Sequence, residues 1–459
     1  MTDLETRLRA EFGERAAAVW VDGEPPAALL HAVHRRRRLH ATVGTALAVT
    51  AALFVAVAVP RVIASERPAE PFDGGHRLSR SAPSVSLLPP SPINALRRDA
   101  SGVWTGKEFV VWGGARVSAP PGSGTTTPSP GPYGPVFADG AAYDPAAQHW
   151  RKLATSPLGP RAGHAAVWTG NAMFVWGGSG FGGATPARID GALYDPVRDS
   201  WRRIADAPKG STGLSATAVL SGAYVVVGAG DSPLGRGPSR VLIYDLRRDR
   251  WHTLDVGAHV YALTSRGADV VALTWTADFT SSPANYSLGV AVIDPATATV
   301  TMRADLPLTP ADEPTLDGRI GLAWTGERLF LATTTFVNRA GDQQSRVYDV
   351  NLSAGAAQLM EVAHGQRTDF VPPLWITMDP NPDTMVWTGD RLLAYADSSF
   401  GEYLPGDSKL HAIAAKGMGN YCSSSAATAW GDGVLYAWSG QKCQVDAPSP
   451  IDGVAVRFR

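Results

Sequence analysis

The sequence predicts an all-β fold built from repeated four-stranded units, and three observations support this prediction. Two long stretches repeat almost letter for letter, and a third keeps part of the same pattern. Turn-forming residues separate short apolar and aromatic runs within each stretch, as an antiparallel meander requires. Units of this kind can be aligned along most of the chain. Repeats of such a length are typical of solenoids, propellers and arrays.

The best-preserved unit spans residues 160–208 and contains four strand-like runs. The runs and the turn signals that end them are Gly163–Trp168 before Thr169-Gly170, Ala172–Trp176 before Gly177-Gly178, Gly191–Tyr194 before Asp195-Pro196, and Trp201–Ala205. The double glycine lets the backbone bend where a Cβ would clash. Tyr194 and Trp201 lie on the last two strands, so we expect them to pack between neighbouring units.

An upstream copy keeps this order and spacing. It reads Val103-Trp104-Thr105-Gly106, Val111-Trp112-Gly113-Gly114, Tyr143-Asp144-Pro145 and then Trp150. The order of Gly-Gly, Tyr-Asp and Trp resembles the kelch repeat, most strongly over residues 101–251. The resemblance implies that each unit is one blade of a β-propeller. His164 stands where kelch units often carry a histidine, so we expect it to be structural. The double glycine is absent after residue 178, so the later units depend on the strand pattern alone.

The aligned first-hairpin turns predict a seven-bladed propeller, with six blades as the alternative. These turns lie near residues 104, 168, 220, 265, 324, 387 and 430. Steps of 43 to 64 residues are long enough for a four-stranded blade and one long loop. A propeller also leaves only short, protected sheet edges.

The last unit has no residues after its third strand to form a fourth, so we expect the N-terminal end of the propeller to supply that strand. Gly453–Arg459 can supply a third strand, but nothing follows it. Ser84–Leu88 occupies the place that Trp201–Ile204 holds before the next unit. The sequence therefore predicts that Ser84–Leu88 pairs beside Val454–Phe458 as the outer strand of the last blade.

The region ahead of the propeller predicts a membrane anchor. Arg35–Arg38 is followed by Ala41–Val59, a run of 19 residues without a charged side chain. About 20 apolar residues cross a bilayer as a helix. We expect a cytoplasmic, partly helical tail over residues 1–39, a transmembrane helix over 40–62, a flexible linker over 63–83 and the propeller over 84–459.

The arginine cluster also predicts the orientation of the chain. The positive-inside rule places residues 1–39 in the cytoplasm and the propeller outside, in a single-pass protein of the cell membrane. Two alternatives stay open. One is a cleavable export signal ending near Ala64, although nearly 40 residues precede its apolar core. The other is a buried core helix, which four adjacent arginines at one end disfavour.

Composition and motifs give no sign of nucleic-acid binding, of a metal site or of a known catalytic motif. A net charge of −1 gives no electrostatic reason to expect a nucleic-acid partner. The ten histidines have no spacing typical of a metal site, and no Gly-x-Ser-x-Gly sequence is present. The kelch resemblance extends to galactose oxidase, but that enzyme's copper site needs a cysteine crosslinked to a tyrosine, and both cysteines here fall in one hairpin. We expect no metal, no cofactor and no catalytic residue.

Loop lengths predict where a partner binds. In a four-stranded meander, the turns between strands one and two and between strands three and four lie on one face, here called the short-turn face. The other connections lie on the opposite, long-loop face, and several of them are long and uneven, which is typical of functional loops. The aromatic residues expected to bind a protein or glycan there are Tyr133, Trp275, Tyr286, Phe400 and Tyr403.

The two cysteines are predicted to form a disulfide. Asp432-Gly433 is a strong signal for a two-residue hairpin turn. Counting outward from that turn places Cys422 opposite Cys443, at a non-hydrogen-bonded pair whose Cα atoms approach to about 4.5 Å. A β-bulge would break the count, and two unpaired thiols are then the alternative.

These features favour a membrane-anchored extracytoplasmic kelch-type propeller that binds a protein or glycan ligand. Two other hypotheses stay open. One is an extracytoplasmic enzyme, such as a lyase, hydrolase or cyclase, with its site at the mouth of the propeller channel. The other is a transmembrane sensor that signals through the N-terminal tail, where Thr2 and Glu5 resemble a capping box.

Overall fold

In the computed structural model of the chain, the residues that the structure describes all lie within Phe72–Arg459. These residues are 83–116, 135–180, 187–211, 213, 217–229, 240–278, 285–308, 319–336, 343–353, 355–366, 385–396, 399–413, 426–438 and 452–458. The predicted tail and membrane helix lie outside them, and so does the predicted linker except for its last residue, Pro83. Within the described ranges, no helix is long and apolar enough to span a membrane.

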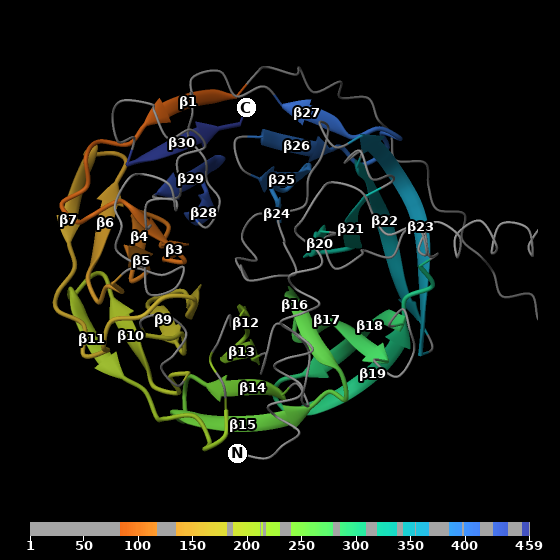
Figure 1. Ribbon diagram of the computed structural model, residues 1–459, viewed down its shortest axis with the longest axis horizontal. Coiled ribbons are helices and arrows are strands. Elements are labelled where there is room, and N and C mark those ends of the chain that lie inside the picture. The colour runs from red at the N-terminus through yellow and green to blue at the C-terminus, as the bar shows by residue number, and fades with distance from the viewer. Residues whose placement is uncertain are drawn as a thin grey trace, which may run out of the picture. The chain divides into compact units, whose positions relative to one another are not determined.

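The described residues form seven four-stranded antiparallel sheets that follow one another around a ring (Figure 1). Blades 1 to 3 comprise β3 (Ser101–Trp104), β4 (Phe109–Trp112), β6 (Gly140–Asp144) and β7 (His149–Lys152); β8 (Ala165–Trp168), β9 (Met173–Trp176), β10 (Gly191–Asp195) and β11 (Ser200–Arg203); and β12 (Thr217–Ser221), β13 (Tyr224–Ala229), β14 (Arg240–Asp245) and β15 (Arg250–Asp255). A short additional sheet, which the sequence did not predict, pairs β2 (Arg97–Arg98) with β5 (Ala115–Arg116).

The later blades have the same plan, with longer strands in blades 4 and 5. Blades 4 to 6 comprise β16 (His259–Arg266), β17 (Asp269–Asp278), β18 (Asn285–Asp294) and β19 (Thr299–Asp305); β20 (Arg319–Trp324), β21 (Leu329–Phe336), β22 (Gln343–Ser353) and β23 (Ala356–Gln366); and β24 (Met385–Trp387), β25 (Leu392–Ala396), β26 (Ser399–Tyr403) and β27 (His411–Ile413). Blade 7 comprises β28 (Ala427–Gly431), β29 (Val434–Trp438), β30 (Gly453–Arg457) and β1 (Ser84–Leu87). The six-bladed alternative is therefore excluded.

Ring closure follows the predicted scheme. β1 pairs antiparallel with β30, from Ser84 opposite Arg457 to Leu87 opposite Val454. The backbone N–H of Leu88 extends this pairing by donating to the carbonyl of Gly453 at 2.9 Å. The first described strand of the chain therefore completes the last blade and links the two ends of the ring.

Glycines allow each blade to make its first turn. In all seven blades of the described region, the turn between the first two strands contains a glycine with positive φ, a backbone conformation that side-chain-bearing residues rarely adopt. These glycines are Gly106, Gly170, Gly222, Gly267, Gly326, Gly389 and Gly433. The first-hairpin turns that the sequence predicted are therefore confirmed in every blade, including those without the double glycine.

The double glycine of blades 1 and 2 has a second physical reason. Gly178 has a φ of +82°, and a Cβ at this position would lie 2.8 Å from the carbonyl oxygen of Ala162. At the same bend, the buried guanidinium of Arg161 donates to the carbonyls of Gly177 and Asp190 at 3.0 and 3.1 Å. Arg97 makes the equivalent bonds to Gly113 and Asp139 in blade 1. The glycines therefore let neighbouring backbone approach the bend closely, and the arginine satisfies carbonyls of that bend.

The hydrophobic core lies between the blades. Seven clusters of buried apolar side chains occur in the described region, one between each pair of neighbouring blades. The predicted Tyr–Trp pairs face each other on the two outer strands, as with Tyr194 and Trp201 at 4.9 Å. Trp201 also contacts Trp112 of the preceding blade at 5.7 Å. Such aromatic contacts between blades hold the ring together.

Candidate functional site

Of the five aromatic residues predicted to bind a ligand, the structure places Trp275 at a pocket. Trp275 is half-buried near the C-terminal end of β17, opposite Leu288 of β18. Tyr133 lies outside the described residues. Tyr286 belongs to β18 and Phe400 to β26, but their side chains lie outside the described part. The predicted set is therefore not shown to converge on one place.

Tyr403 requires a correction. The sequence placed it among the ligand-binding aromatic residues of the long-loop face, whereas it ends strand β26 and is 1% exposed. Its ring packs edge-on against Phe330 of blade 5, with centroids 5.4 Å apart. The alternation of the short strand β26, which the turn pattern did not predict, directs this side chain into the core between blades 5 and 6.

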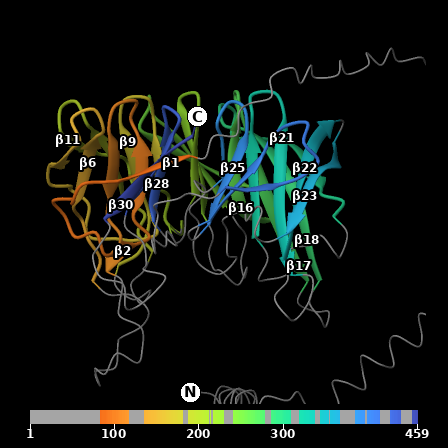
Figure 2. The ribbon, with the colours of Figure 1, turned by 90° about the horizontal axis from the view of Figure 1, so that it is seen from above.

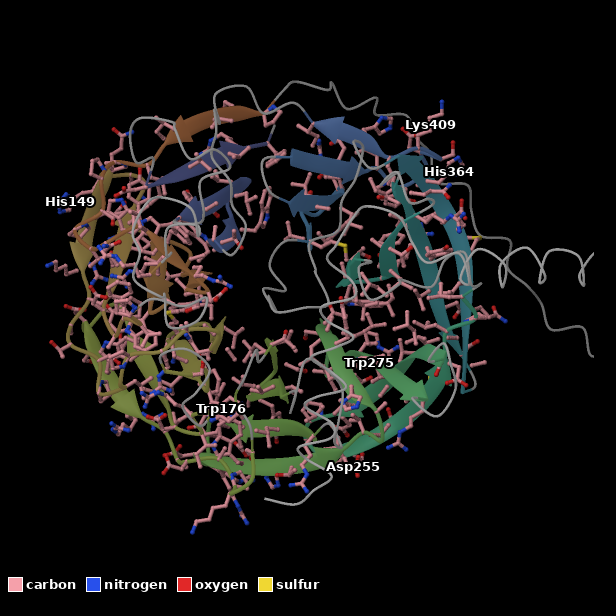
Figure 3. All side chains as sticks on the ribbon, in the orientation of Figure 1. His149, Trp176, Asp255, Trp275, His364 and Lys409 are labelled. Carbon is pink, nitrogen blue, oxygen red and sulfur yellow. The ribbon has the colours of Figure 1, made fainter. Side chains whose placement is uncertain are left out.

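A pocket of about 520 Å³ surrounds the predicted Trp275. It lies where the crossing from blade 3 to blade 4 passes the ends of β17, β18 and β19 (Figure 3). Its polar lining consists of Asp255, Thr274, Thr276, Ser287, Arg303 and Asp305. Figure 2 shows the far ends of β17 and β18 on the same face of the ring as β2, where the connections from second to third strands begin. The pocket therefore belongs to the long-loop face.

The strand register explains why polar groups gather here. Thr276 is directly opposite Ser287 across β17 and β18, and their hydroxyl oxygens lie 2.6 Å apart. Gly289 is opposite both Thr274 on β17 and Asp305 on β19. A Cβ at Gly289 would lie 3.2 Å from the Thr274 hydroxyl, so the missing side chain leaves space among these groups.

Arg303 fixes the wall of the pocket. Its guanidinium donates to the carbonyl of Val256 at 3.2 Å and to the carbonyl of Asp255 at 3.3 Å. The Asp255 carboxylate in turn accepts from the N–H of Gly257 at 2.7 Å. These bonds attach the exit of blade 3 to the outer strand of blade 4. The pocket therefore presents hydroxyl, carboxylate and guanidinium groups from a preformed backbone, as ligand sites usually do.

Neither family models nor curated proteins gave a match to this chain. The kelch resemblance consequently has no support beyond its motifs and the blade architecture.

A serine and a histidine meet at the start of the inner strands of blades 1 and 2. The Ser101 Oγ and the His164 Nε2 lie 2.7 Å apart, a geometry found in nucleophile–base pairs. Burial, and then the charge of Arg161, lower the pKa of His164 from 6.5 to about 3. An imidazole with this pKa is a weak base at neutral pH.

The surroundings of His164 agree with a structural role. Its ring packs edge-on against Trp112, and it leaves no room for a Cβ at Gly113, which would lie 2.7 Å from the His164 Cε1. The pair therefore supports the bend between blades 1 and 2. Among the described residues, no group of three or more His, Cys, Asp or Glu is arranged to hold a metal ion.

Sequence reasoning missed most of the lining of the pocket. Arg303 and Asp305 lie on β19, where exposed and half-buried residues alternate in the usual way. Nothing in their local sequence separates them from other outward-facing strand residues. Only the pairing of β18 with β19 brings them beside Thr274 and Trp275.

Proposed function

We propose that this protein is a membrane-anchored, extracytoplasmic kelch-type propeller that binds a glycan on its long-loop face. The observation that carries the binding proposal is the pocket of about 520 Å³ around Trp275, whose lining includes hydroxyl, carboxylate and guanidinium groups. Its volume is in the range of small-ligand sites. The anchor and the location outside the cell are supported by the arginine cluster and the uncharged run that follows it.

The chemistry of the lining suits a sugar better than an apolar ligand. A sugar ring presents adjacent hydroxyls that both donate and accept hydrogen bonds. The carboxylates of Asp255 and Asp305 accept, the Arg303 guanidinium donates, and the hydroxyls of Thr274 and Ser287 do either. Hydrogen bonds to charged groups are the stronger ones, so the two carboxylates are expected to contribute most to affinity.

The test is binding of the full chain, in detergent, to a panel of neutral and acidic oligosaccharides. We expect at least one oligosaccharide to bind, and Asp305→Ala to weaken it about tenfold, because one charge-assisted hydrogen bond contributes ~1.5 kcal/mol. The control is Glu327→Gln, an exposed residue in the turn between β20 and β21. Absence of binding across the panel, or equal effects of the two substitutions, would contradict the proposal.

A further inference from the structure

Inside the pocket around Trp275, one row of the blade 4 sheet has an open position between two polar side chains. Thr274 on β17, Gly289 on β18 and Asp305 on β19 lie directly opposite one another, and all three line the pocket. Residues that are opposite one another in an antiparallel sheet present their side chains on the same face. Because Gly289 has no side chain, the row consists of a hydroxyl, an open position and a carboxylate.

Three oxygen atoms converge on this open position. A Cβ at Gly289 would lie 3.2 Å from the hydroxyl oxygen of Thr274 and 3.8 Å from a carboxylate oxygen of Asp305. The same point lies 3.0 Å from the backbone carbonyl oxygen of Ala304. A carbonyl oxygen has two lone pairs, so it can accept a second hydrogen bond besides one in the sheet ladder. A hydrogen-bond donor placed above Gly289 therefore finds three acceptors.

The Thr274 hydroxyl has unused hydrogen-bonding capacity. Thr274 is only 6% exposed, and within the described ranges no hydrogen bond joins its hydroxyl to another residue. Buried hydroxyls in proteins are normally hydrogen-bonded, since an unsatisfied one costs free energy. The hydroxyl is directed at the open position, so a group that enters the pocket there would supply the missing partner.

The Asp305 carboxylate is also unpaired in the part of the chain that the structure describes. Asp305 is exposed at the end of β19, and no cation or hydrogen-bond donor of that part binds it. Arg303 lies two residues before it, on the same face of the strand, but its guanidinium donates to the carbonyls of Val256 and Asp255 at 3.2 and 3.3 Å. The Asp305 charge is therefore available to a ligand.

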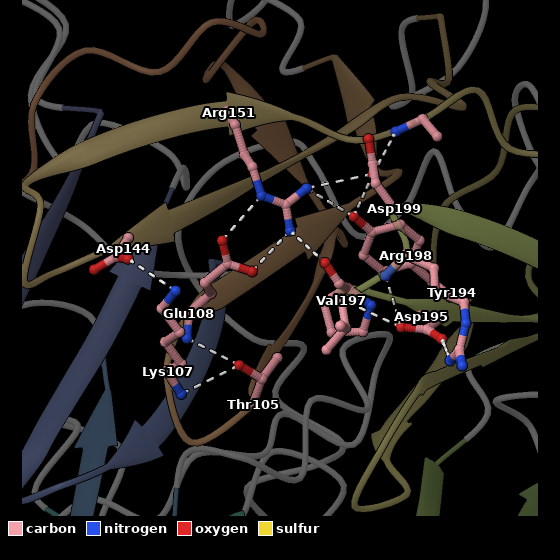
Figure 4. Close-up of polar contacts among 12 residues, drawn as sticks. Thr105, Lys107, Glu108, Asp144, Arg151, Tyr194, Asp195, Val197, Arg198 and Asp199 are labelled. Carbon is pink, nitrogen blue, oxygen red and sulfur yellow. Dashed lines mark hydrogen bonds and ion pairs between the residues drawn. The ribbon is translucent and has the colours of Figure 1, made fainter.

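Carboxylates that support the fold of this propeller are bound, which sets Asp305 apart. In the network between blades 1 and 2, Glu108 accepts from the guanidinium of Arg151 at 2.9 and 2.7 Å (Figure 4). In the same network, Asp195 accepts from the guanidinium of Arg198 at 2.7 Å. Asp305 has no such structural bond, so its side chain is free to serve recognition.

We propose that the pocket around Trp275 recognises an amino sugar, whose protonated amino group occupies the open position above Gly289. An ammonium has three N–H donors and no acceptor, which matches three oxygen acceptors around one point. It donates to the Thr274 hydroxyl, the Asp305 carboxylate and the Ala304 carbonyl. A sugar hydroxyl offers one donor there, and an N-acetyl group offers one N–H and no charge. This inference rests on the proposed glycan binding and names the class of sugar.

The test compares three β-1,4-linked oligosaccharides of equal length, made of glucosamine, of N-acetylglucosamine and of glucose. Isothermal titration calorimetry measures their binding to the full chain in detergent, at a pH that keeps the amines protonated. We expect the glucosamine oligomer to bind at least about tenfold more tightly than the other two, because a hydrogen bond to a charged group contributes ~1.5–3 kcal/mol.

Two substitutions test the location of the amine. Gly289→Ala fills the open position and removes no polar group, and Asp305→Asn removes the charge at nearly constant size. Each should reduce the affinity for the glucosamine oligomer about tenfold and abolish the preference for it. Gly321→Ala is the control, because Gly321 is also a strand glycine without positive φ but lies outside the pocket. It should leave the preference unchanged.

The outcomes separate this inference from the proposed function. Equal affinities for the three oligomers would overturn the assignment of an amino sugar and leave glycan binding in place. A preference for glucosamine that persists in both Gly289→Ala and Asp305→Asn would also overturn it, since the amine would then bind elsewhere. Asp305 is exposed, so its variant remains informative if Gly289→Ala perturbs folding. Absence of binding by these oligomers and by the wider panel would contradict the proposed function itself.

Discussion

At the scale of single residues, buried polar side chains occur where the backbone of a bend supplies their partners. Arg161 is completely buried, yet its Nε, Nη1 and Nη2 atoms all have acceptors between 2.9 and 3.1 Å away. Arg97 repeats this arrangement one blade earlier. Burial lowers the pKa of both arginines, but their hydrogen bonds keep the charge compensated.

Removing the Arg161 guanidinium should therefore destabilise the propeller strongly. Arg161→Met leaves the Gly177 and Asp190 carbonyls and the Asp190 carboxylate without this donor, and we expect a loss of ~3 kcal/mol. Arg203→Met is the control, because its guanidinium also reaches Asp190, at 3.6 Å, but is 57% exposed. Chemical denaturation should show less than ~1 kcal/mol for the control. Equal losses would contradict the role given to the buried bonds.

His164 predicts a pH dependence of stability. Its folded pKa is about 3 and the unfolded value is 6.5, so between these values the unfolded chain binds a proton that the folded chain excludes. Stability is therefore fully present above about pH 6.5 and falls as the pH decreases, by up to ~1.4 kcal/mol per pH unit. Denaturation at a series of pH values measures this slope.

His164→Gln provides the comparison for that slope. The variant cannot take up a proton at this position, so the difference between wild-type and variant stability should shrink as the pH decreases from about 6.5 to about 4.5. Replacement of the exposed His149 by Gln is the control and should leave the wild-type slope in place. A slope that persists in His164→Gln would show that another group causes it.

At the scale of elements, strand β1 closes the ring mainly through its backbone. Three of its four residues are exposed, so little apolar surface is buried by the strand itself. Leu88, directly after it, is 5% exposed and packs with Tyr436 and Trp438 of blade 7. Stabilisation by ring closure therefore depends on the ladder with β30, on this leucine and on the half-buried Val85, which packs against the apolar cluster of blade 7.

Substitution of two neighbouring leucines shows how much the buried Leu88 side chain contributes to the stability of the closed ring. Leu88→Ala should destabilise the propeller by ~2–4 kcal/mol, as core leucine truncations do. Leu87→Ala, at a position that is 56% exposed, should cost less than ~1 kcal/mol. Thermal or chemical unfolding of both variants is the measurement. Similar losses in the two would mean that the Leu88 side chain is not the anchor of the closing strand.

The hairpin of β28 and β29 bears on the cysteine prediction. Its register runs from Gly431 opposite Val434 to Ala427 opposite Trp438, the pairing that counting outward from the Asp432-Gly433 turn predicted. Cys422 and Cys443 lie outside the described residues, so their disulfide stays a prediction. The same count reaches them if no bulge intervenes.

Mass spectrometry of unreduced peptides checks the disulfide. We expect a Cys422–Cys443 linkage in protein taken from the oxidising side of the membrane. The bond would close a loop of about 20 residues, so Cys422→Ser should reduce stability by ~3 kcal/mol. Free, alkylatable thiols in that material would contradict the pairing.

At the scale of the whole molecule, lysines offer a direct test of orientation. Every lysine of the chain lies in the propeller, and the tail over residues 1–39 contains none. Lys107 is 78% exposed. If the propeller is outside the cell, a membrane-impermeant amine reagent should label intact cells as strongly as lysed cells. Labelling only after lysis would reverse the proposed orientation, and labelled protein found free in the medium would favour a cleavable signal.

The blade architecture could be predicted from the sequence because its causes are local. A glycine with positive φ produces each first turn. A Tyr–Trp pair, such as Tyr194 with Trp201, marks the two outer strands of each well-preserved blade. The closing strand was predicted from an unfilled place in the last blade. These features depend on backbone conformation and strand order, which short stretches of sequence specify.

The candidate sites depend on which side chains from separate strands and blades become neighbours, and only the tertiary structure decides this. Trp275 was predicted as an aromatic residue near a long connection, but Arg303 and Asp305 join it through the register of β18 with β19. Tyr403 turned inward because a short strand, not a loop, carries it. The sequence by itself determined the repeated blade and the closure of the ring, since turn chemistry and strand spacing act over a few residues. The packing of one blade against the next determined where polar groups meet, because that packing joins residues that no local pattern relates.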